Sequence, residues 1–159
     1  MSFSRQVPQV LDAEHRANLA LLERLERALG AGAAESELAP LAAALVRQLE
    51  RELVHHFGFE EAELFPRMAE AGDGDLAALL SEEHASIRAV AEELLPLARA
   101  LSKGALAASE RPAFKRLAFE LIERMVAHIQ KETMALLPLL DDLLDDETDR
   151  ELAFAYSAD

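Results

Sequence analysis

The chain has 159 residues, with 16 basic and 30 acidic side chains, a formal net charge of −14 and no cysteine. This length suits one domain, and a content of 51% hydrophobic residues excludes compositional disorder. The negative charge argues against nucleic-acid binding, because a phosphate backbone would repel the chain. The absence of cysteine excludes disulfides and thiolate metal sites, so any metal must be bound by histidine and carboxylate side chains.

The N-terminal residues have neither the basic start nor the apolar run of a signal peptide. No apolar stretch approaches the ~20 residues that a membrane-spanning helix needs. We therefore expect a cytoplasmic protein that does not bind membranes.

The predicted elements are all helices, because Ala, Leu, Glu and Arg dominate and the chain holds only 6 Gly and 6 Pro. The helices are expected, in chain order, at about 8–29, 37–71, 75–102 and 110–145, followed by a short helix at about 148–156. We predict an all-α fold, an up-down-up-down four-helix bundle with a short extra C-terminal helix, which forms one domain over residues 1–159.

Each long helix carries an apolar stripe with alternating spacings of four and three, which is typical of the inner face of a bundle. Ionisable residues interrupt all four stripes near mid-helix. They are His15 in the first helix, His56 and Glu60 in the second, His84 in the third, and His128 and Glu132 in the fourth. A buried carboxylate is costly without a counter-charge, and no Lys or Arg lies on these stripes. The cluster therefore needs a counter-charge that the stripes themselves do not supply.

The interruptions also repeat along the chain. The His56-x-x-x-Glu60 motif of the second helix recurs as His128-x-x-x-Glu132 in the fourth, and a proline follows each motif at the same offset. These prolines are expected to bend or end their helices beyond the site. The pattern indicates a duplicated helical hairpin, in which each half brings two histidines and one glutamate to the centre of the bundle.

The chemistry of this set favours two metal ions. His and Glu four residues apart lie on one helix face and reach the same interior point. Four neutral imidazoles and two carboxylates match two divalent cations that share bridging carboxylates, and the mixture of ligands favours iron or manganese, with zinc as a possible substitute. A ferritin-type site needs Glu-x-x-His in two helices, but the chain offers only Glu52 to His55, which disfavours that site. The competing interpretation, ordinary hydrogen-bonded core histidines, would have to explain six such residues meeting in a two-fold pattern.

Four segments, HHFGFEEAELFPRM, HIQKETMALLPLL, AEHRANLALLERL and SEEHASIRAVAEEL, resemble the hemerythrin-like (HHE cation-binding) family over essentially the whole chain. The resemblance implies two iron ions joined by an oxo or hydroxo bridge. It assigns His15 and His56 to one iron, His84 and His128 to the other, and Glu60 and Glu132 to both. The internal repeat predicts the same partition of the ligands.

One position departs from the family pattern. Hemerythrins that carry oxygen reversibly have a second histidine one turn after the first on the third helix, where this chain has Arg88. The remaining set is similar to the di-iron site of proteins implicated in repairing iron centres under nitric oxide stress. The resemblance therefore implies a partner such as O2, NO or peroxide, with a role as sensor, scavenger or weak oxidase or peroxidase. Iron storage or donation without turnover, and a purely structural metal site, remain alternatives.

Two neighbours of the second-helix motif are further candidates. Glu61 is expected to take a terminal coordination site, to hydrogen-bond a ligand histidine, or to lie outside the site. His55 is rotated ~100° from His56 around the helix. It is a candidate ligand or hydrogen-bond partner, and otherwise it faces solvent.

The other neighbours are predicted to lie outside the site. Glu14 and Glu83, each directly before a ligand histidine, are expected on the surface. Arg88 is expected to pair with Glu92 one turn further along its helix. Tyr156, on the short terminal helix, is expected to pack on the surface.

Overall fold

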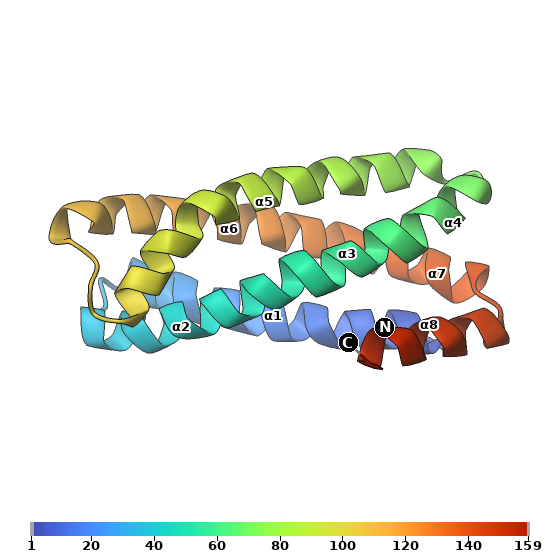
Figure 1. Cartoon of the computed structure of the whole chain (residues 1–159), viewed down its shortest axis with the longest axis horizontal. Helices are drawn as coiled ribbons and strands as arrows, with labels where there is room; N and C mark the ends of the chain where they lie inside the picture. The colour runs from blue at the N-terminus through green and yellow to red at the C-terminus, as the bar shows by residue number, and fades with distance from the viewer. Residues whose placement is uncertain (1, 159) are drawn as a thin grey trace.

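A computed structural model describes residues 2–158, which form helices without any strand. The first and third bundle helices are α1 (Gln6–Gly30) and α5 (Gly74–Ser102). The second is one continuous helix made of α2 (Glu35–Arg51), η1 (Glu52–His56), α3 (Phe57–Phe59), η2 (Glu60–Leu64) and α4 (Phe65–Glu70). The fourth consists of η3 (Ala108–Glu110), α6 (Arg111–Lys131), η4 (Glu132–Leu136) and α7 (Leu137–Leu143), and α8 (Asp146–Ala158) follows it. The predicted all-α bundle with an extra C-terminal helix is confirmed (Figure 1).

A glycine with positive φ follows each of the first three bundle helices. Gly32 and Gly72 follow α1 and α4 with φ of +67° and +95°, in the left-handed region that favours glycine. At Gly72 the chain turns back so that the Asp73 N–H donates to the Met68 carbonyl at 2.8 Å. These turns satisfy carbonyls at the helix ends and make the next helix antiparallel.

The apolar core consists of two separate clusters. The first lies between the second half of α1, α2, the second half of α5 and α6. It includes Leu25, Leu45, Leu94 and Leu121. The second lies between the start of α1, α4, the start of α5, α7 and α8, and it includes Leu11, Leu64, Leu80, Leu140 and Tyr156. A layer of buried histidines and glutamates lies in the same bundle. The chain therefore places its buried ionisable groups where a continuous apolar core would otherwise run.

Three short segments, η1, η2 and η4, are π-helical turns, whereas η3 is a 3-10 turn. Pro66 and Pro138 stand directly after η2 and η4, in the first turns of α4 and α7. A π turn pairs a carbonyl with the N–H five residues on, so a proline just beyond it need not donate to the carbonyl four residues back. The helices consequently run past these prolines, to Glu70 and Leu143.

The C-terminal helix α8 lies along the first half of α1 (Figure 1). Asp149, only 4% exposed, accepts the backbone N–H groups of Gln6 and Val7 at 2.8 and 2.9 Å. Asp141 accepts those of Ser4 and Arg5 at 2.9 and 2.8 Å. Both carboxylates satisfy N–H groups at or before the start of α1 that have no partner within the helix. Asp149 thereby fixes α8 against α1, and Asp141 fixes α7 against the residues before α1.

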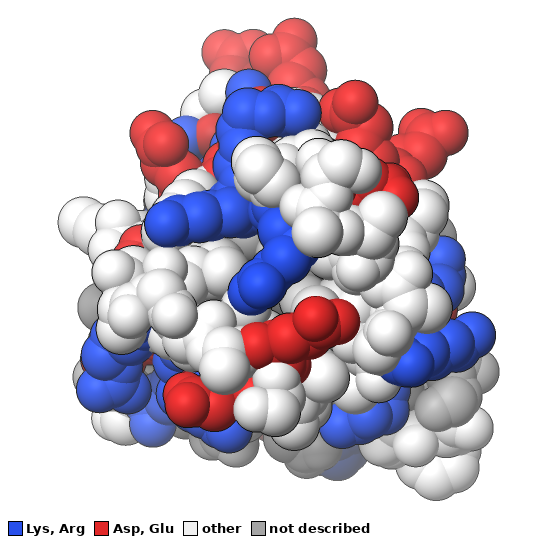
Figure 2. Space-filling view, turned by 90° about the vertical axis from the view of Figure 1, so that its left-hand side faces the viewer, with Lys and Arg blue, Asp and Glu red and all other residues white. Residues whose placement is uncertain are grey.

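The opposite end of the bundle carries basic side chains despite the net charge. Figure 2 shows this end, where Lys and Arg side chains gather around the middle with acidic ones beside and above them. A cavity of about 420 Å³ at this end is lined by apolar residues together with Arg111 and Lys115, and none of the six candidate ligands lines it. None of the helices in residues 2–158 has both the length and the apolar character needed to cross a membrane.

Candidate metal centre

The six residues predicted to bind metal meet in the middle of the bundle. They come from all four bundle helices: His15 from α1, His56 from η1, Glu60 from η2, His84 from α5, His128 from α6 and Glu132 from η4. None is more than 2% exposed. Buried ionisable groups at this density require compensation by one another or by bound cations.

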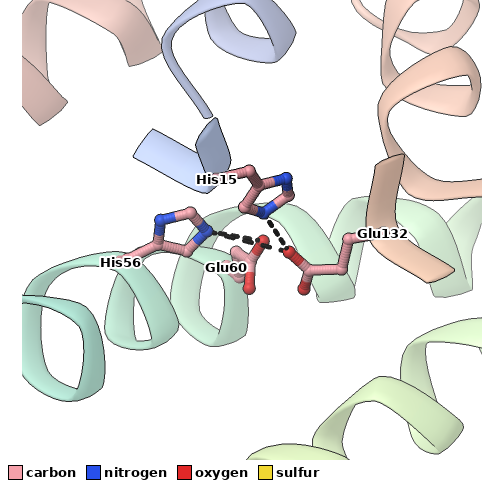
Figure 3. Close-up of side chains that lie close together, drawn as sticks. All are labelled: His15, His56, Glu60 and Glu132. Atoms are coloured by element: carbon pink, nitrogen blue, oxygen red, sulfur yellow. Dashed lines mark hydrogen bonds and ion pairs between the residues drawn. The ribbon is translucent and has the colours of Figure 1, made fainter. Parts of the chain in front are cut away.

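One half of the cluster consists of His15, His56 and both glutamates (Figure 3). The Nε2 atom of His15 lies 2.9 Å from Oε1 of Glu132, and the Nε2 atom of His56 lies 3.2 Å from Oε2 of Glu60. The same His56 atom is 3.7 Å from Oε1 of Glu132. One potential ligand atom from each of the four residues falls within a span of 4.8 Å.

The other half consists of His84, His128 and the same two glutamates, again within 4.8 Å. The Nε2 atom of His84 lies 3.1 Å from Oε1 of Glu60 and 3.6 Å from Oε2 of Glu132. The Nε2 atom of His128 lies 3.0 Å from Oε2 of Glu132. Each carboxylate thus presents one oxygen to each histidine pair, which is the arrangement that a bridging ligand requires. The geometry matches the predicted partition, while metal binding by these six residues stays a prediction.

Four inward-facing atoms make no well-directed hydrogen bond within residues 2–158, although they lie 3.0–3.6 Å from one another across the cluster. They are Oε1 of Glu60, Nε2 of His84, Nε2 of His128 and Oε2 of Glu132, all buried. Buried polar atoms in native proteins are almost always paired, so four such atoms in one place indicate a missing partner. A nitrogen and oxygen donor set of this kind fits divalent metal ions of the iron, manganese and zinc type.

The Nδ1 atom of each of the four histidines, on the far side of the ring from the cluster, makes a hydrogen bond to a residue outside the six candidate ligands. The Nδ1 partners are Thr133 for His15 (3.2 Å), Glu14 for His56 (2.9 Å), Glu61 for His84 (2.7 Å) and Glu83 for His128 (2.8 Å). An ionised carboxylate can only accept, so three of the rings carry hydrogen on Nδ1. Their Nε2 atoms are therefore left to bind metal, as in metal sites whose ligand histidines are oriented by carboxylates.

A sequence model of the Hemerythrin HHE cation binding domain matches residues 7–140 of the chain. The chain belongs to the hemerythrin family. This confirms the predicted family, and together with the buried His and Glu cluster it indicates a metal-binding site. All six candidate ligands of this hemerythrin domain lie within the matched residues, whereas α8 lies beyond them. No curated protein matches the chain.

Two predictions about neighbouring glutamates in this hemerythrin domain were wrong. Glu14 and Glu83 are half-buried rather than on the surface, and they accept from His56 and His128. Each glutamate directly precedes a histidine on its own helix but contacts a histidine on the neighbouring helix. The sequence contains one signal that these glutamates are special, which is that they occupy equivalent positions in the internal repeat. Each directly precedes the single histidine on the first helix of its hairpin.

The pairing predicted for Arg88 was also wrong. Its guanidinium donates to both oxygens of Glu61, at 2.7 and 3.0 Å, rather than to Glu92, and it also donates to the carbonyl of Leu53. Glu61 lies outside both groups of candidate ligands and hydrogen-bonds His84 instead, which was one of the predicted options. Arg88 therefore fixes the carboxylate that orients His84.

His55 and Tyr156 lie together beside the cluster. Their rings stack at 4.0 Å, with an angle of 19° between the planes. His55 is half-buried and belongs to neither group of candidate ligands. Tyr156 was expected on the surface, but it is only 4% exposed and its hydroxyl donates to Glu14. Burial, followed by the hydrogen bond and charge of Glu14, raises the pKa of Tyr156 against the opposing charge of His56, so the hydroxyl stays protonated.

Glu52 is a buried member of the site that the sequence did not predict. It is 4% exposed, accepts from Nδ2 of Asn18 at 2.8 Å and lies 3.4 Å from Nδ1 of His56. Burial raises the pKa of its carboxyl, and this effect exceeds the opposing influence of His56 and Asn18. A usable signal existed, because Glu52 stands one helical turn before His56 on the same face.

Without metal, protons on the histidines balance the two carboxylates. Burial alone lowers the pKa of His84, but the carboxylates of Glu132 and Glu60 close to its Nε2 atom outweigh burial and raise this pKa to about 9. The pKa of His128 is raised against burial by Glu132, and that of His56 is raised well above its ordinary value, with Glu52 the largest favourable influence. The histidines oppose burial in turn and hold the pKa of Glu132 well below its usual range. A bound cation would replace these protons.

Proposed function

We propose that the chain is a non-haem di-iron protein that binds O2, NO or peroxide, and that it acts as a sensor, scavenger or weak oxidase or peroxidase. The observation that carries the proposal is that Glu60 and Glu132 each present one oxygen to each histidine pair. Each ion would receive two imidazole nitrogens and two carboxylate oxygens. Octahedral iron takes more donors than these four, so positions would remain open for a small ligand.

The donor set favours iron over the other candidate metals. Imidazole suits iron, zinc, copper and nickel, whereas carboxylate suits harder ions such as manganese. Iron accepts both kinds of ligand. When bound, it would supply electrons for redox chemistry and open positions for a diatomic ligand. A structural zinc site usually has four protein ligands around a single ion, which leaves no open position. Here two carboxylates would instead be shared between two ions.

The protein's part in this chemistry is to bind, orient and keep water away. The ring of Phe57 stacks on His84 at 3.7 Å with planes 3° apart, and Phe65 lies 5.4 Å from the same ring. These apolar contacts and the burial of the ligands create a dry site, in which charges interact more strongly than in water. The carboxylates on Nδ1 hold the imidazoles in place.

The test is anaerobic reconstitution of the full chain with ferrous iron, followed by optical spectra before and after O2, NO or azide. We expect about two iron ions per chain and charge-transfer bands that change with the ligand. Met134→Ala, at a position 77% exposed and two residues from Glu132, is the matched control and should behave as the parent. Fewer than about one iron per chain, or spectra insensitive to all three ligands, would contradict the proposal.

Iron storage or donation is the second candidate, favoured by the net charge of −14, which attracts cations. The burial of all six ligands disfavours it, because fast release needs exposed ligands. Rapid loss of iron to a mild chelator, without any spectral response to O2, NO or peroxide, would support storage over the proposed reaction.

A further inference from the structure

Helix α8 contacts the metal centre although it lies beyond residues 7–140, which the family model matches. The hydroxyl of Tyr156 donates to Oε1 of Glu14, and the same oxygen accepts from Nδ1 of His56 at 2.9 Å. The other ring nitrogen of His56 faces Glu60 at 3.2 Å. A hydrogen-bonded chain therefore runs from α8 to a predicted metal ligand.

The position of Tyr156 is fixed by contacts on several sides. Its ring stacks on His55 at 4.0 Å and packs against Phe59 at 4.6 Å. Leu152, one helical turn before Tyr156, is buried in the second core cluster. Asp149, two turns before Tyr156, accepts from backbone N–H groups at the start of α1. The hydroxyl is thus held in place by packing that does not involve Glu14.

In the other half of the cluster, a lysine takes the role that Tyr156 has here, as hydrogen-bond donor to the carboxylate that orients a histidine. There, Glu83 holds His128, and Lys131, three residues after that histidine, donates to Glu83. Three residues after His56 the chain has Phe59, which cannot donate. Lys131 therefore has no counterpart at this position of the repeat.

Tyr156 packs against Phe59 and supplies the missing donor from α8. A guanidinium nitrogen of Arg51 lies 3.5 Å from the second oxygen of Glu14, on a side chain that is 60% exposed, so it is screened by solvent. Each carboxylate that orients a histidine is thus anchored by a donor, and only the one at His56 depends on a residue outside the four bundle helices.

We infer that α8 is a working part of the metal centre, in which Tyr156 is a positioning residue that holds Glu14 against His56 and so sets the affinity of the metal position at His15 and His56. The inference rests on the proposed function only in requiring that the cluster binds metal. Loss of an outer partner of a ligand histidine typically weakens metal binding ~10–100-fold. We expect an effect of this size at one of the two positions.

The experiment compares Tyr156→Phe with the parent in the full chain, using Zn²⁺ as a diamagnetic probe. The substitution keeps the ring and its stacking and removes only the hydroxyl. Competition with a chelator should show one Zn²⁺ position weakened ~10–100-fold and the other unchanged. Nitrogen-15 spectra of the histidines should show a changed Nδ1–H signal for His56 and an unchanged one for His128.

Three further variants make the comparison specific. Phe154→Ala, at a position on α8 that is 76% exposed, is the matched control and should bind Zn²⁺ as the parent does. Lys131→Met should weaken the other position and change the His128 signal. Glu14→Gln leaves the packing of α8 in place and should weaken the same position as Tyr156→Phe, which keeps the inference testable if Tyr156→Phe folds poorly.

The outcomes separate this inference from the proposed function. Parent-like Zn²⁺ affinities and an unchanged His56 signal in Tyr156→Phe would overturn the inference. Equal weakening of both positions, together with a lower melting temperature of the metal-free protein, would also overturn it, because the role of Tyr156 would then be structural. One weakened position supports the inference, even if the iron form of the parent is inert to O2, NO and peroxide and the proposed function fails.

Discussion

At the scale of single residues, Glu132 has the most central place in the cluster. Its Oε1 atom faces His15 and His56, and its Oε2 atom faces His84 and His128. Its pKa is held well below the usual range by the four histidines around it, whose effect outweighs burial. This one carboxylate therefore supplies negative charge to both predicted metal positions.

Glu132→Gln is expected to weaken metal binding at both positions. The amide keeps the size of the side chain but loses the charge, and its NH2 group replaces one of the two bridging oxygens. The loss should exceed the ~10–100-fold that removal of an outer partner costs. Metal content after dialysis is the measurement, with Met134→Ala as control. Retention of two tightly bound ions by Glu132→Gln would show that Glu132 does not bridge them.

Arg88 shows why the departure from the oxygen-carrying hemerythrins matters. In place of a further imidazole, the chain has a guanidinium that binds both oxygens of Glu61, while Glu61 accepts from His84. Arginine matches a carboxylate well in this two-bond geometry. Arg88 thus supports His84, a predicted ligand, from outside the cluster, and each half of the cluster keeps two histidines.

At the scale of helices, the sequence predicted the stripes and the six inward residues, but it did not predict the π turns. The spacing from His56 to Glu60 and from His128 to Glu132 reads as ordinary α-helix. In the structure, π turns contain or follow these residues in both helices. Widened turns of this kind often occur at functional sites. The prolines after η2 and η4 were the only trace of them in the sequence.

The partners of the histidines were not predictable for a different reason. Glu14 and Glu83 lie on the edge of their own helices, where a glutamate usually faces solvent. Their contacts depend on how closely the neighbouring helix approaches, which helical periodicity does not describe. The position of Tyr156 depends on a contact between the two ends of the sequence, because Asp149 fixes α8 against the start of α1.

At the scale of the whole molecule, the buried cluster links stability to pH and to metal. Without metal, Glu132 and Glu60 outweigh burial and raise the pKa of His84 from its ordinary value of 6.5 to about 9. A raised folded-state pKa contributes stability that is full below the unfolded pKa and is lost as pH rises through the folded one. Metal binding acts in the opposite direction, because it requires neutral imidazoles and releases their protons.

Melting temperatures at about pH 6.5 and about pH 9 test this linkage, since these values are the ordinary and the raised pKa of His84, between which its contribution to stability falls. The metal-free protein should melt at a lower temperature at the higher pH. The rise in melting temperature on adding Zn²⁺ should be larger there, because fewer protons compete for the histidines. A metal-induced rise that is larger at pH 6.5 than at pH 9 would contradict the linkage.

The central claim is that the bundle holds two metal ions between two histidine pairs and two shared carboxylates. Anomalous scattering at the iron edge, from crystals of the iron-reconstituted protein, tests it most directly. The account predicts two separate peaks, one beside His15 and His56 and the other beside His84 and His128, both next to Glu60 and Glu132. A single peak, or peaks away from these residues, would contradict it.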